Sequence, residues 1–328
     1  MPQLNPITAS RTLDMLRSAF GPDITAALDA PDVIEIMVNP DGKLWLDKLG
    51  HGRVDTKIII TPADAERVVR LVASHIKQEV SVSSPVVSAE LPGGGERFEG
   101  ILPPVSTAPC FSIRKGAVAI FTLNDYVKVK TMTKDQAQEL RYAVTSRQNI
   151  LIVGGTSSGK TTLANALLSE IADAKDRVVI LEDTRELRCA AKDTVALRTN
   201  GKNVTLADLV RSTLRLRPDR IIIGEVRGPE ALDMLKAWNT GHPGGIATVH
   251  ANSAKAGLAR IEQLILEGIS SVPRALIAEA IDVIVFISGR GNQRRIETIA
   301  HVNGVTGDTY DLEVFSKPKP ILKLIKET

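Results

Sequence analysis

The residues best suited to chemistry lie at positions 154–162, where the sequence reads GGTSSGKTT. Four of them, Gly154, Gly159, Lys160 and Thr161, fit the pattern G-x-x-x-x-G-K-[ST]. An apolar run precedes this motif and a helix-like run follows it, which is the strand–loop–helix context of a phosphate-binding loop. Glycines let backbone N–H groups converge on an anion, and the start of a helix adds the positive end of its dipole.

The motif therefore predicts nucleotide binding. Lys160 would reach the β- and γ-phosphates of ATP, and the Thr161 hydroxyl would bind Mg²⁺. The loop residues predicted to contact the nucleotide are Gly154, Gly155, Thr156, Ser157, Ser158, Gly159, Lys160, Thr161 and Thr162.

Two apolar stretches further along the chain end in carboxylates. Glu182 and Asp183 follow the run Ile180-Leu181, and Glu225 follows the run 220–224. The carboxyl ends of strands form the edge where open α/β sheets bind ligands. Glu182 could hold a metal-bound or attacking water, and Glu225 could coordinate Mg²⁺ through water or polarise the attacking water. The alternative for Glu182 and Asp183 is a strand-end turn with solvated acids.

One histidine and several arginines complete the candidate site. Residues 240–252, TGHPGGIATVHAN, predict a glycine-rich turn and a strand that ends at His250. A neutral imidazole there could contact a γ-phosphate or its water, although a lone histidine is more often structural. Guanidinium groups stabilise the charge that develops in phosphoryl transfer, although most surface arginines have no such role. The candidate arginines are Arg97, Arg114, Arg215 and Arg227.

The elements that must position these residues fall into two predicted domains. Residues 1–118 have an α+β pattern: a helix near 13–20, a hairpin around residues 39–42, a helix that begins at Thr61, and a second hairpin around residues 93–95. Residues 119–133 are predicted to be a linker. Residues 134–328 alternate apolar strands (149–153, 177–182, 194–199, 220–226, 245–250) with helices (160–172, 205–216, 229–240, 253–267), and period-2 runs at 282–288 and 295–302 close the domain. The predicted class is α/β, with a parallel sheet buried on both faces.

Composition excludes several classes of protein. Hydrophobic residues make up 43% and charged residues 24%, as in ordinary folded proteins. A net charge of +3 and an aromatic content of 3% argue against direct nucleic-acid binding. The two cysteines, Cys110 and Cys189, have no zinc-ligand spacing and are expected to be reduced thiols. No signal peptide or apolar run of about 18 residues is evident, which predicts a cytoplasmic protein or one on the cytoplasmic face of a membrane.

Taken in order, GGTSSGKTT, LEDTREL, RPDRIIIGEVRG and GHPGGIATVHAN resemble the motifs of the secretion-ATPase superfamily, and most of all its conjugal-transfer branch. Members of this superfamily power type IV secretion, type II secretion and type IV pili. The segments 91–97, 101–105 and 111–115 also match. The resemblance implies a RecA-like C-terminal domain joined to a smaller, PAS-like N-terminal domain, in a homohexamer that holds ATP at the seam between the domains. It also implies ATP hydrolysis for a conjugation or type IV secretion apparatus, contact with inner-membrane channel components, and a position peripheral to the cytoplasmic face of the inner membrane.

The resemblance also implies a role for each candidate residue. Lys160 and Thr161 would serve the phosphates and Mg²⁺, Glu225 would be the Walker B acid, Glu182 the acidic-box carboxylate that handles water, and His250 the histidine-box residue. Arg97 and Arg114 would reach the γ-phosphate when the domains close, and Arg215 and Arg227 lie in matching motifs. Gly224-Glu225 stands where many P-loop proteins have aspartate, so either Glu225 or Glu182 could be the general base.

Other functions fit parts of this pattern. An ATP-gated scaffold would bind and assemble with negligible turnover, although the acids at 182 and 225 argue against it. A DNA-translocating hexamer would need a basic, aromatic-lined pore, which the low aromatic content disfavours. A small-molecule kinase lacks a visible acceptor motif. The basic tail that holds Lys317, Lys319, Lys323 and Lys326 could touch anionic lipid or could be a frayed end.

Overall fold

The computed structural model describes residues 6–48, 51–93, 95–116, 121–172, 175–200 and 203–315. The chain divides into two compact units, residues 1–118 and 119–328. Gly94 and the basic tail with its four lysines lie outside the described residues.

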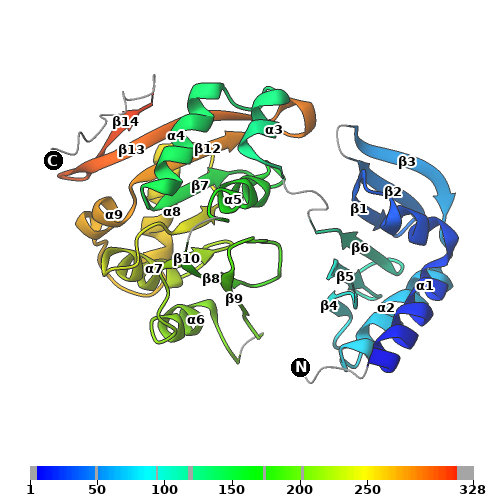
Figure 1. The fold of residues 1–328 in the computed structure, drawn as a ribbon. Helices are drawn as coiled ribbons and strands as arrows, with labels where there is room; N and C mark the ends of the chain where they lie inside the picture. Colours follow the sequence, from blue (N-terminus) through cyan, green and yellow to red (C-terminus); the bar gives the residue numbers. More distant parts are fainter. Residues whose placement is uncertain are drawn as a thin grey trace. The chain divides into compact units, whose positions relative to one another are not determined.

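The first unit is an antiparallel sheet with helices α1 (Pro6–Asp29) and α2 (Pro62–His75) along one face (Figure 1). Its six strands are ordered β3-β2-β1-β6-β5-β4. Their bounds are Val33–Val38 (β1), Lys43–Lys48 (β2), Gly52–Ile59 (β3), Val86–Glu90 (β4), Arg97–Ile101 (β5) and Cys110–Arg114 (β6). Strand β3 was not predicted, because it is an edge strand without a buried position.

Strand alternation puts the core of the first unit on the helical side of its sheet. Ile36 of β1 and Ile113 of β6 are cross-strand partners, and both are buried in one cluster with Phe20 of α1 and Val69 of α2. Helix α2 begins as predicted, with the Thr61 side chain accepting the N–H of Asp64 at 3.2 Å. Along each strand, the residues that alternate with these buried ones therefore lie on the other face of the sheet.

The second unit is a mixed α/β domain with helices on both faces of its sheet, which confirms the α/β class (Figure 1). Its eight strands are ordered β14-β13-β12-β7-β11-β10-β8-β9. Strands from β12 to β9 pair in parallel, and β13 and β14 are antiparallel. The bounds are Ile150–Gly154 (β7), Arg177–Glu182 (β8), Asp193–Arg198 (β9), Arg220–Ile223 (β10), Ile246–Val249 (β11), Val283–Ser288 (β12), Arg295–Thr306 (β13) and Thr309–Val314 (β14).

Helices bury both faces of this sheet, which explains why its strands read as continuous apolar runs. In β7, Ile150 and Ile152 join the core beneath α3, α4 and α5, whereas Leu151 and Val153 join the core beneath α6, α7, α8 and α9. The helices are Leu123–Lys128 (α3), Lys134–Thr145 (α4), Lys160–Ser169 (α5), Leu206–Thr213 (α6), Glu230–Asn239 (α7), Ala254–Leu266 (α8) and Arg274–Ala280 (α9), and a short 3₁₀ turn spans Gly291–Gln293.

The structure differs from the sequence prediction at residues 119–133, which were expected to be a linker. Helix α3 lies in this stretch, and Leu123, Tyr126 and Met132 are buried in the core of the second unit. The apolar side chains of the stretch thus serve packing, and its described part belongs to the second unit.

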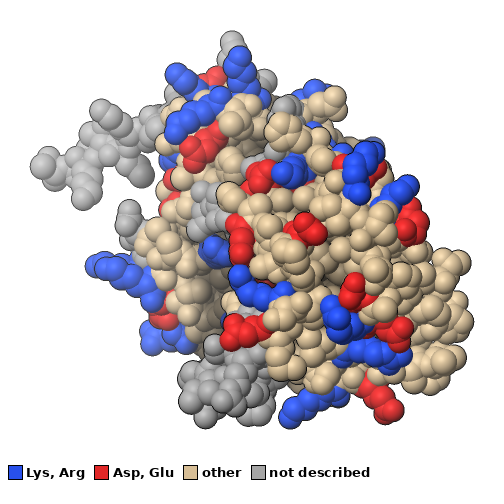
Figure 2. Space-filling view, turned by 90° about the vertical axis from the view of Figure 1, so that its right-hand side faces the viewer, with Lys and Arg blue, Asp and Glu red and all other residues tan. Residues whose placement is uncertain are grey.

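The surface carries both signs of charge. On the face shown in Figure 2, Lys and Arg side chains are interspersed with Asp and Glu, without a broad area of one sign. Among the helices of the described ranges, none is both long and apolar enough to cross a membrane.

Candidate nucleotide site

The predicted phosphate loop joins the end of β7 to the start of α5. Ser157 and Gly159 have φ values of 62° and 96°, so the loop turns through left-handed conformations, and Gly159 is the residue before the first turn of α5. A Cβ on Gly154 would lie 2.5 Å from Ser158 Oγ and 2.6 Å from the carbonyl oxygen of Ile287 in β12, so this position requires glycine. The loop therefore lies tightly against the sheet and leads into a helix N-terminus, which favours an anion.

Lys160 is the centre of a chain of polar contacts. Only 7% of this residue is exposed, and its Nζ donates to the carbonyl oxygen of Gly155 at 3.1 Å. The same nitrogen lies 3.2 Å from Nδ1 and 3.3 Å from Nε2 of His250, which directly follows β11. Nε2 of His250 is also 2.6 Å from Oε1 of Glu225. The imidazole therefore lies between the ammonium group of Lys160 and the carboxylate of Glu225.

Glu225 is held from its other side by Arg227. The guanidinium Nε donates to Oε2 of Glu225 at 2.7 Å, and Nη1 lies 3.7 Å from a carboxylate oxygen of Asp183. Burial lowers the pKa of Arg227, but the carboxylates of Glu225, Asp183 and Glu186 outweigh it and raise this pKa overall. Glu225 is thus a carboxylate shared by a histidine and an arginine at the carboxyl edge of the sheet.

Glu182 is oriented by the backbone that follows it. Its Oε1 accepts the N–H groups of Glu186 at 2.9 Å and Leu187 at 2.8 Å, and only 4% of the residue is exposed. Strands β8 and β10 are neighbours, and a Cβ on Gly224 would lie 3.0 Å from Cγ of Glu182. The glycine before Glu225 therefore makes room for the Glu182 side chain, which explains the Gly-Glu pair at this strand end.

Arg97 and Arg114 lie side by side in the first unit. They are directly opposite each other on β5 and β6, with Glu90 opposite Arg97 on β4 and Glu35 opposite Arg114 on β1. Directly opposed residues share one face of a sheet, with Cβ atoms about 4.5–5.5 Å apart. Like charges in such a pair are unfavourable, and here an acid flanks each arginine. The sequence did not predict the role of Glu35 and Glu90, because their position opposite the arginines follows only from strand register.

Arg215 does not join the other candidates within one chain. It is exposed in the turn after α6, next to Leu216, whose carbonyl oxygen accepts from Arg177 Nε at 2.9 Å at the start of β8. This is the amino edge of the sheet, whereas Lys160, Glu182, Glu225, His250 and Arg227 gather at the carboxyl edge.

The oxygen donors at this edge fit a magnesium ion that arrives with a nucleotide. Thr161 lies in the first turn of α5, and the carboxylates of Glu182 and Glu225 lie at the ends of β8 and β10. Mg²⁺ usually keeps several waters and takes phosphate oxygens, so few protein ligands are needed. Across the described ranges, no group of three or more His, Cys, Asp or Glu side chains could hold a resident metal.

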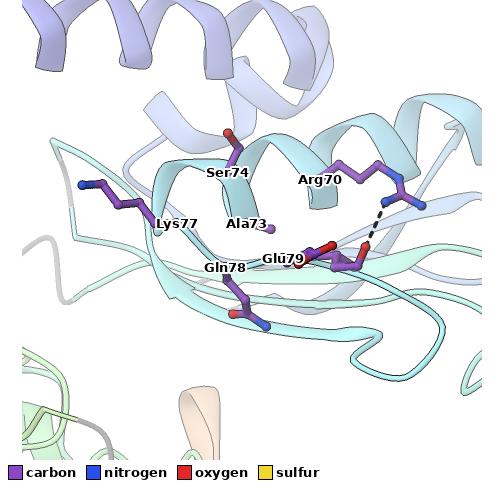
Figure 3. Close-up of a pocket in the computed structure, with 7 residues that line it drawn as sticks. Arg70, Ala73, Ser74, Lys77, Gln78 and Glu79 are labelled. Atoms are coloured by element: carbon purple, nitrogen blue, oxygen red, sulfur yellow. Dashed lines mark hydrogen bonds between the residues drawn. The ribbon is translucent and has the colours of Figure 1, made fainter.

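Surface hollows lie beside this site and in the first unit. One of about 290 Å³ adjoins the Glu225–Arg227 pair and is lined by Asp183, Thr199, Arg227 and Glu230 among others. The other, of about 360 Å³, lies at the end of α2 in the first unit (Figure 3). In the second hollow Arg70 donates to the backbone carbonyl of Val80 at 3.3 Å, and none of the predicted site residues lines it.

Another residue beside the phosphate loop was missed by sequence reasoning. Arg294 follows the 3₁₀ turn before β13, and its guanidinium lies against Gly159. It is far from the loop in sequence, and no motif contains it.

Comparison with known proteins agrees with the motifs. The family model of the type II/IV secretion system proteins matches residues 51–290. The chain is 48% identical over 309 residues to the conjugal transfer protein TrbB of Rhizobium radiobacter, covering 94% of this chain and 95% of that protein. It is 33% identical over 317 residues to the type IV secretion system protein PtlH of Bordetella pertussis, covering 85% and 93% of the two chains.

Among solved structures, the pilus retraction motor PilT with bound ADP has a TM-score of 0.59 at 20% identity, covering 91% of this chain and 82% of that one. This likeness supports the fold. The resemblance predicted from the motifs is confirmed, and the chain belongs to the type II/IV secretion system protein family, with the fold of a P-loop NTPase.

Proposed function

We propose that this protein is a Mg²⁺-dependent ATPase that works as a homohexamer and powers assembly or substrate transfer by a bacterial conjugation or type IV secretion apparatus. The observation that carries the ATPase assignment is the chain Lys160–His250–Glu225, set directly at the phosphate loop. The names of the relatives, a conjugal transfer protein and a type IV secretion system protein, support the apparatus.

The family resemblance supports further parts of the proposal. We assign the second unit to the RecA-like class and the first to the PAS-like class, with ATP at the seam between them. Contact with inner-membrane channel components, at the cytoplasmic face of that membrane, belongs to the same proposal. The basic tail would add a peripheral contact with anionic lipid.

Nucleotide binding would rearrange the contacts of Lys160. In the described structure its ammonium group contacts the Gly155 carbonyl and His250. Phosphate oxygens are stronger partners for an ammonium than a neutral carbonyl or imidazole, so Lys160 would turn to them. His250 would stay beside Glu225 and present Nδ1 to the γ-phosphate or its water.

The two glutamates differ in what binds them, which suggests different roles. Glu225 contacts a histidine and an arginine, so its negative charge is already shared. Glu182 has one oxygen fixed by two backbone N–H groups. We assign Glu182 to orienting and deprotonating the attacking water, and Glu225 with Thr161 to holding Mg²⁺, which would neutralise charge on the phosphoryl oxygens when bound.

The adjacent guanidinium groups of Arg97 and Arg114 suit a γ-phosphoryl group, whose charge is spread over three oxygens. Closure of the first unit over the nucleotide would bring them to it, and hydrolysis would release them. The resulting domain rotation would do the mechanical work.

The test is phosphate release by purified protein, with solution mass measured with and without ATP. Wild type should form hexamers and release phosphate, and Lys160→Ala should reduce release to background. Lys236→Ala, on the exposed side of α7, is the matched control and should retain wild-type turnover. Turnover that survives Lys160→Ala would refute the ATPase assignment.

The same measurements separate the alternatives. ATP-dependent rings with background phosphate release would identify a scaffold. Strongly salt-dependent binding to single-stranded DNA would favour a translocase.

A further inference from the structure

Arg294 lies on the phosphate loop. A Cβ on Gly159 would lie 2.8 Å from Nε and 2.9 Å from Cζ of Arg294, so the guanidinium occupies the space that the missing side chain leaves. Nη2 of Arg294 donates to the carbonyl oxygen of Ser157 at 3.4 Å. One side chain therefore touches the two loop residues that have positive φ values.

The segment that carries Arg294 is firmly held. Strand β12 pairs with β7 in parallel, with Ile287 opposite Gly154, so the end of β12 lies beside the start of the loop. On the other side of Arg294, the N–H of Ile296 donates to the Thr131 carbonyl at 2.8 Å. Because both flanks are anchored to the domain, Arg294 can transmit that rigidity to the loop.

Arg294 is half-buried. Its Nε is inaccessible to water and has no hydrogen-bond partner within the described residues. The buried phenol of Tyr126 in α3 is close enough for the positive charge of Arg294 to oppose the rise in pKa that burial causes in this tyrosine. A half-buried guanidinium without a carboxylate partner in the described part of the chain suits a position beside an anion site.

We propose that Arg294 is a positioning residue that holds the phosphate loop in its nucleotide-binding conformation and thereby sets the affinity for ADP and ATP. Ser157 is not a glycine, and its φ of 62° is unfavourable without support. When only a fraction of molecules has the competent loop, the apparent dissociation constant rises by the inverse of that fraction. Arg294 raises this fraction without touching the reacting atoms. The inference rests on the proposed nucleotide binding by the loop.

The experiment measures ADP binding by calorimetry and ATP turnover for wild type, Arg294→Ala and Arg294→Lys. A net hydrogen-bond contribution corresponds to about 2- to 13-fold in an equilibrium constant. Arg294→Ala should raise the ADP dissociation constant and the KM for ATP by a factor in this range, with kcat at saturating ATP unchanged. Arg294→Lys keeps the charge but cannot lie flat on Gly159, so it should bind with intermediate affinity.

A neighbouring arginine provides the control. Arg295 is exposed and its Nε lies 2.5 Å from Glu297 Oε1, so Arg295→Ala should bind ADP like wild type. A merely structural role for Arg294 would lower the melting temperature of the nucleotide-free protein and leave the ADP affinity of the folded fraction unchanged.

Two results would overturn the inference alone: an Arg294→Ala variant with wild-type affinity, or an Arg294→Lys variant equal to wild type, since charge alone would then suffice. A wild-type protein that binds neither ADP nor ATP would overturn the proposed function and the inference together.

Discussion

Replacing His250 by alanine tests the chain of contacts at the centre of the site. The substitution removes the hydrogen bond between the Lys160 ammonium and Nδ1 at 3.2 Å, and the imidazole whose Nε2 lies 2.6 Å from Glu225. A hydrogen bond to a charged group contributes about 1.5–3 kcal/mol. Because 44% of the His250 side chain is exposed, the lower part of this range applies, about 1.5–2 kcal/mol. At 1.36 kcal/mol per decade, kcat/KM should fall about 10- to 30-fold.

The assay is steady-state phosphate release together with ADP binding. ADP affinity of His250→Ala should equal or exceed that of wild type, because Lys160 loses a contact that competes with the phosphates. His242→Ala is the matched control: His242 precedes β11, whereas His250 follows it, and its Nδ1 is 3.1 Å from the Ala237 carbonyl oxygen at the opposite edge. Turnover of His250→Ala within twofold of wild type would refute the reasoning, as would an equal loss in His242→Ala.

Three further predictions concern the acids and the buried charges. Glu182→Gln should lower kcat by about 10²–10⁴-fold with ADP affinity retained, whereas Glu225→Gln should chiefly raise the Mg²⁺ concentration needed for turnover; the reverse pattern would exchange their roles. Arg220→Ala should lower the free energy of unfolding, measured by urea titration, by about 3 kcal/mol, because Arg220 is buried and its Nε donates to Asp176 at 2.6 Å. A loss below about 1 kcal/mol, the usual contribution of an exposed ion pair, would contradict this prediction. Burial raises the pKa of Asp282 above its ordinary value of 3.8, against the opposing Asn149 N–H and His301. The folded state therefore holds this proton more tightly, so the stability contribution is full below pH 3.8 and is lost as pH rises through the folded pKa. Asp282→Asn should make the free energy of unfolding depend less on pH in this range. An unchanged pH dependence would exclude Asp282 as its source.

Much of the second unit was predictable because its strands are buried on both faces. Residues 177–182 read as an apolar run, and β8 has the same bounds, Arg177–Glu182. Helix α3 was missed because six residues are too few to show a helical period, and its apolar side chains looked like a linker. The phosphate loop was readable because its glycines meet local steric demands, such as the 2.5 Å that would separate a Cβ on Gly154 from Ser158 Oγ.

Contacts that depend on strand register or on distant segments were not predictable. Arg97 and Arg114 each lie in a recognisable segment, but their pairing across β5 and β6 follows from register alone. Arg294 reaches the loop because β12 pairs with β7, which no local pattern reveals. Motifs thus indicated the candidate reacting groups, whereas the side chains that contact those groups were found in the tertiary structure.

The charges of the site have partners within the described structure. Lys160 contacts a carbonyl and an imidazole, and Glu225 is shared by His250 and Arg227. Phosphate binding is then an exchange of partners, in which little new charge is left uncompensated and the desolvation of Lys160 has been met during folding. In the proposed function the β-phosphate would keep Lys160 in both ATP and ADP, whereas His250 would contact the γ-phosphate or its water only with ATP. The chain Lys160–His250–Glu225 would then give the proposed ATPase a means of distinguishing ATP from ADP.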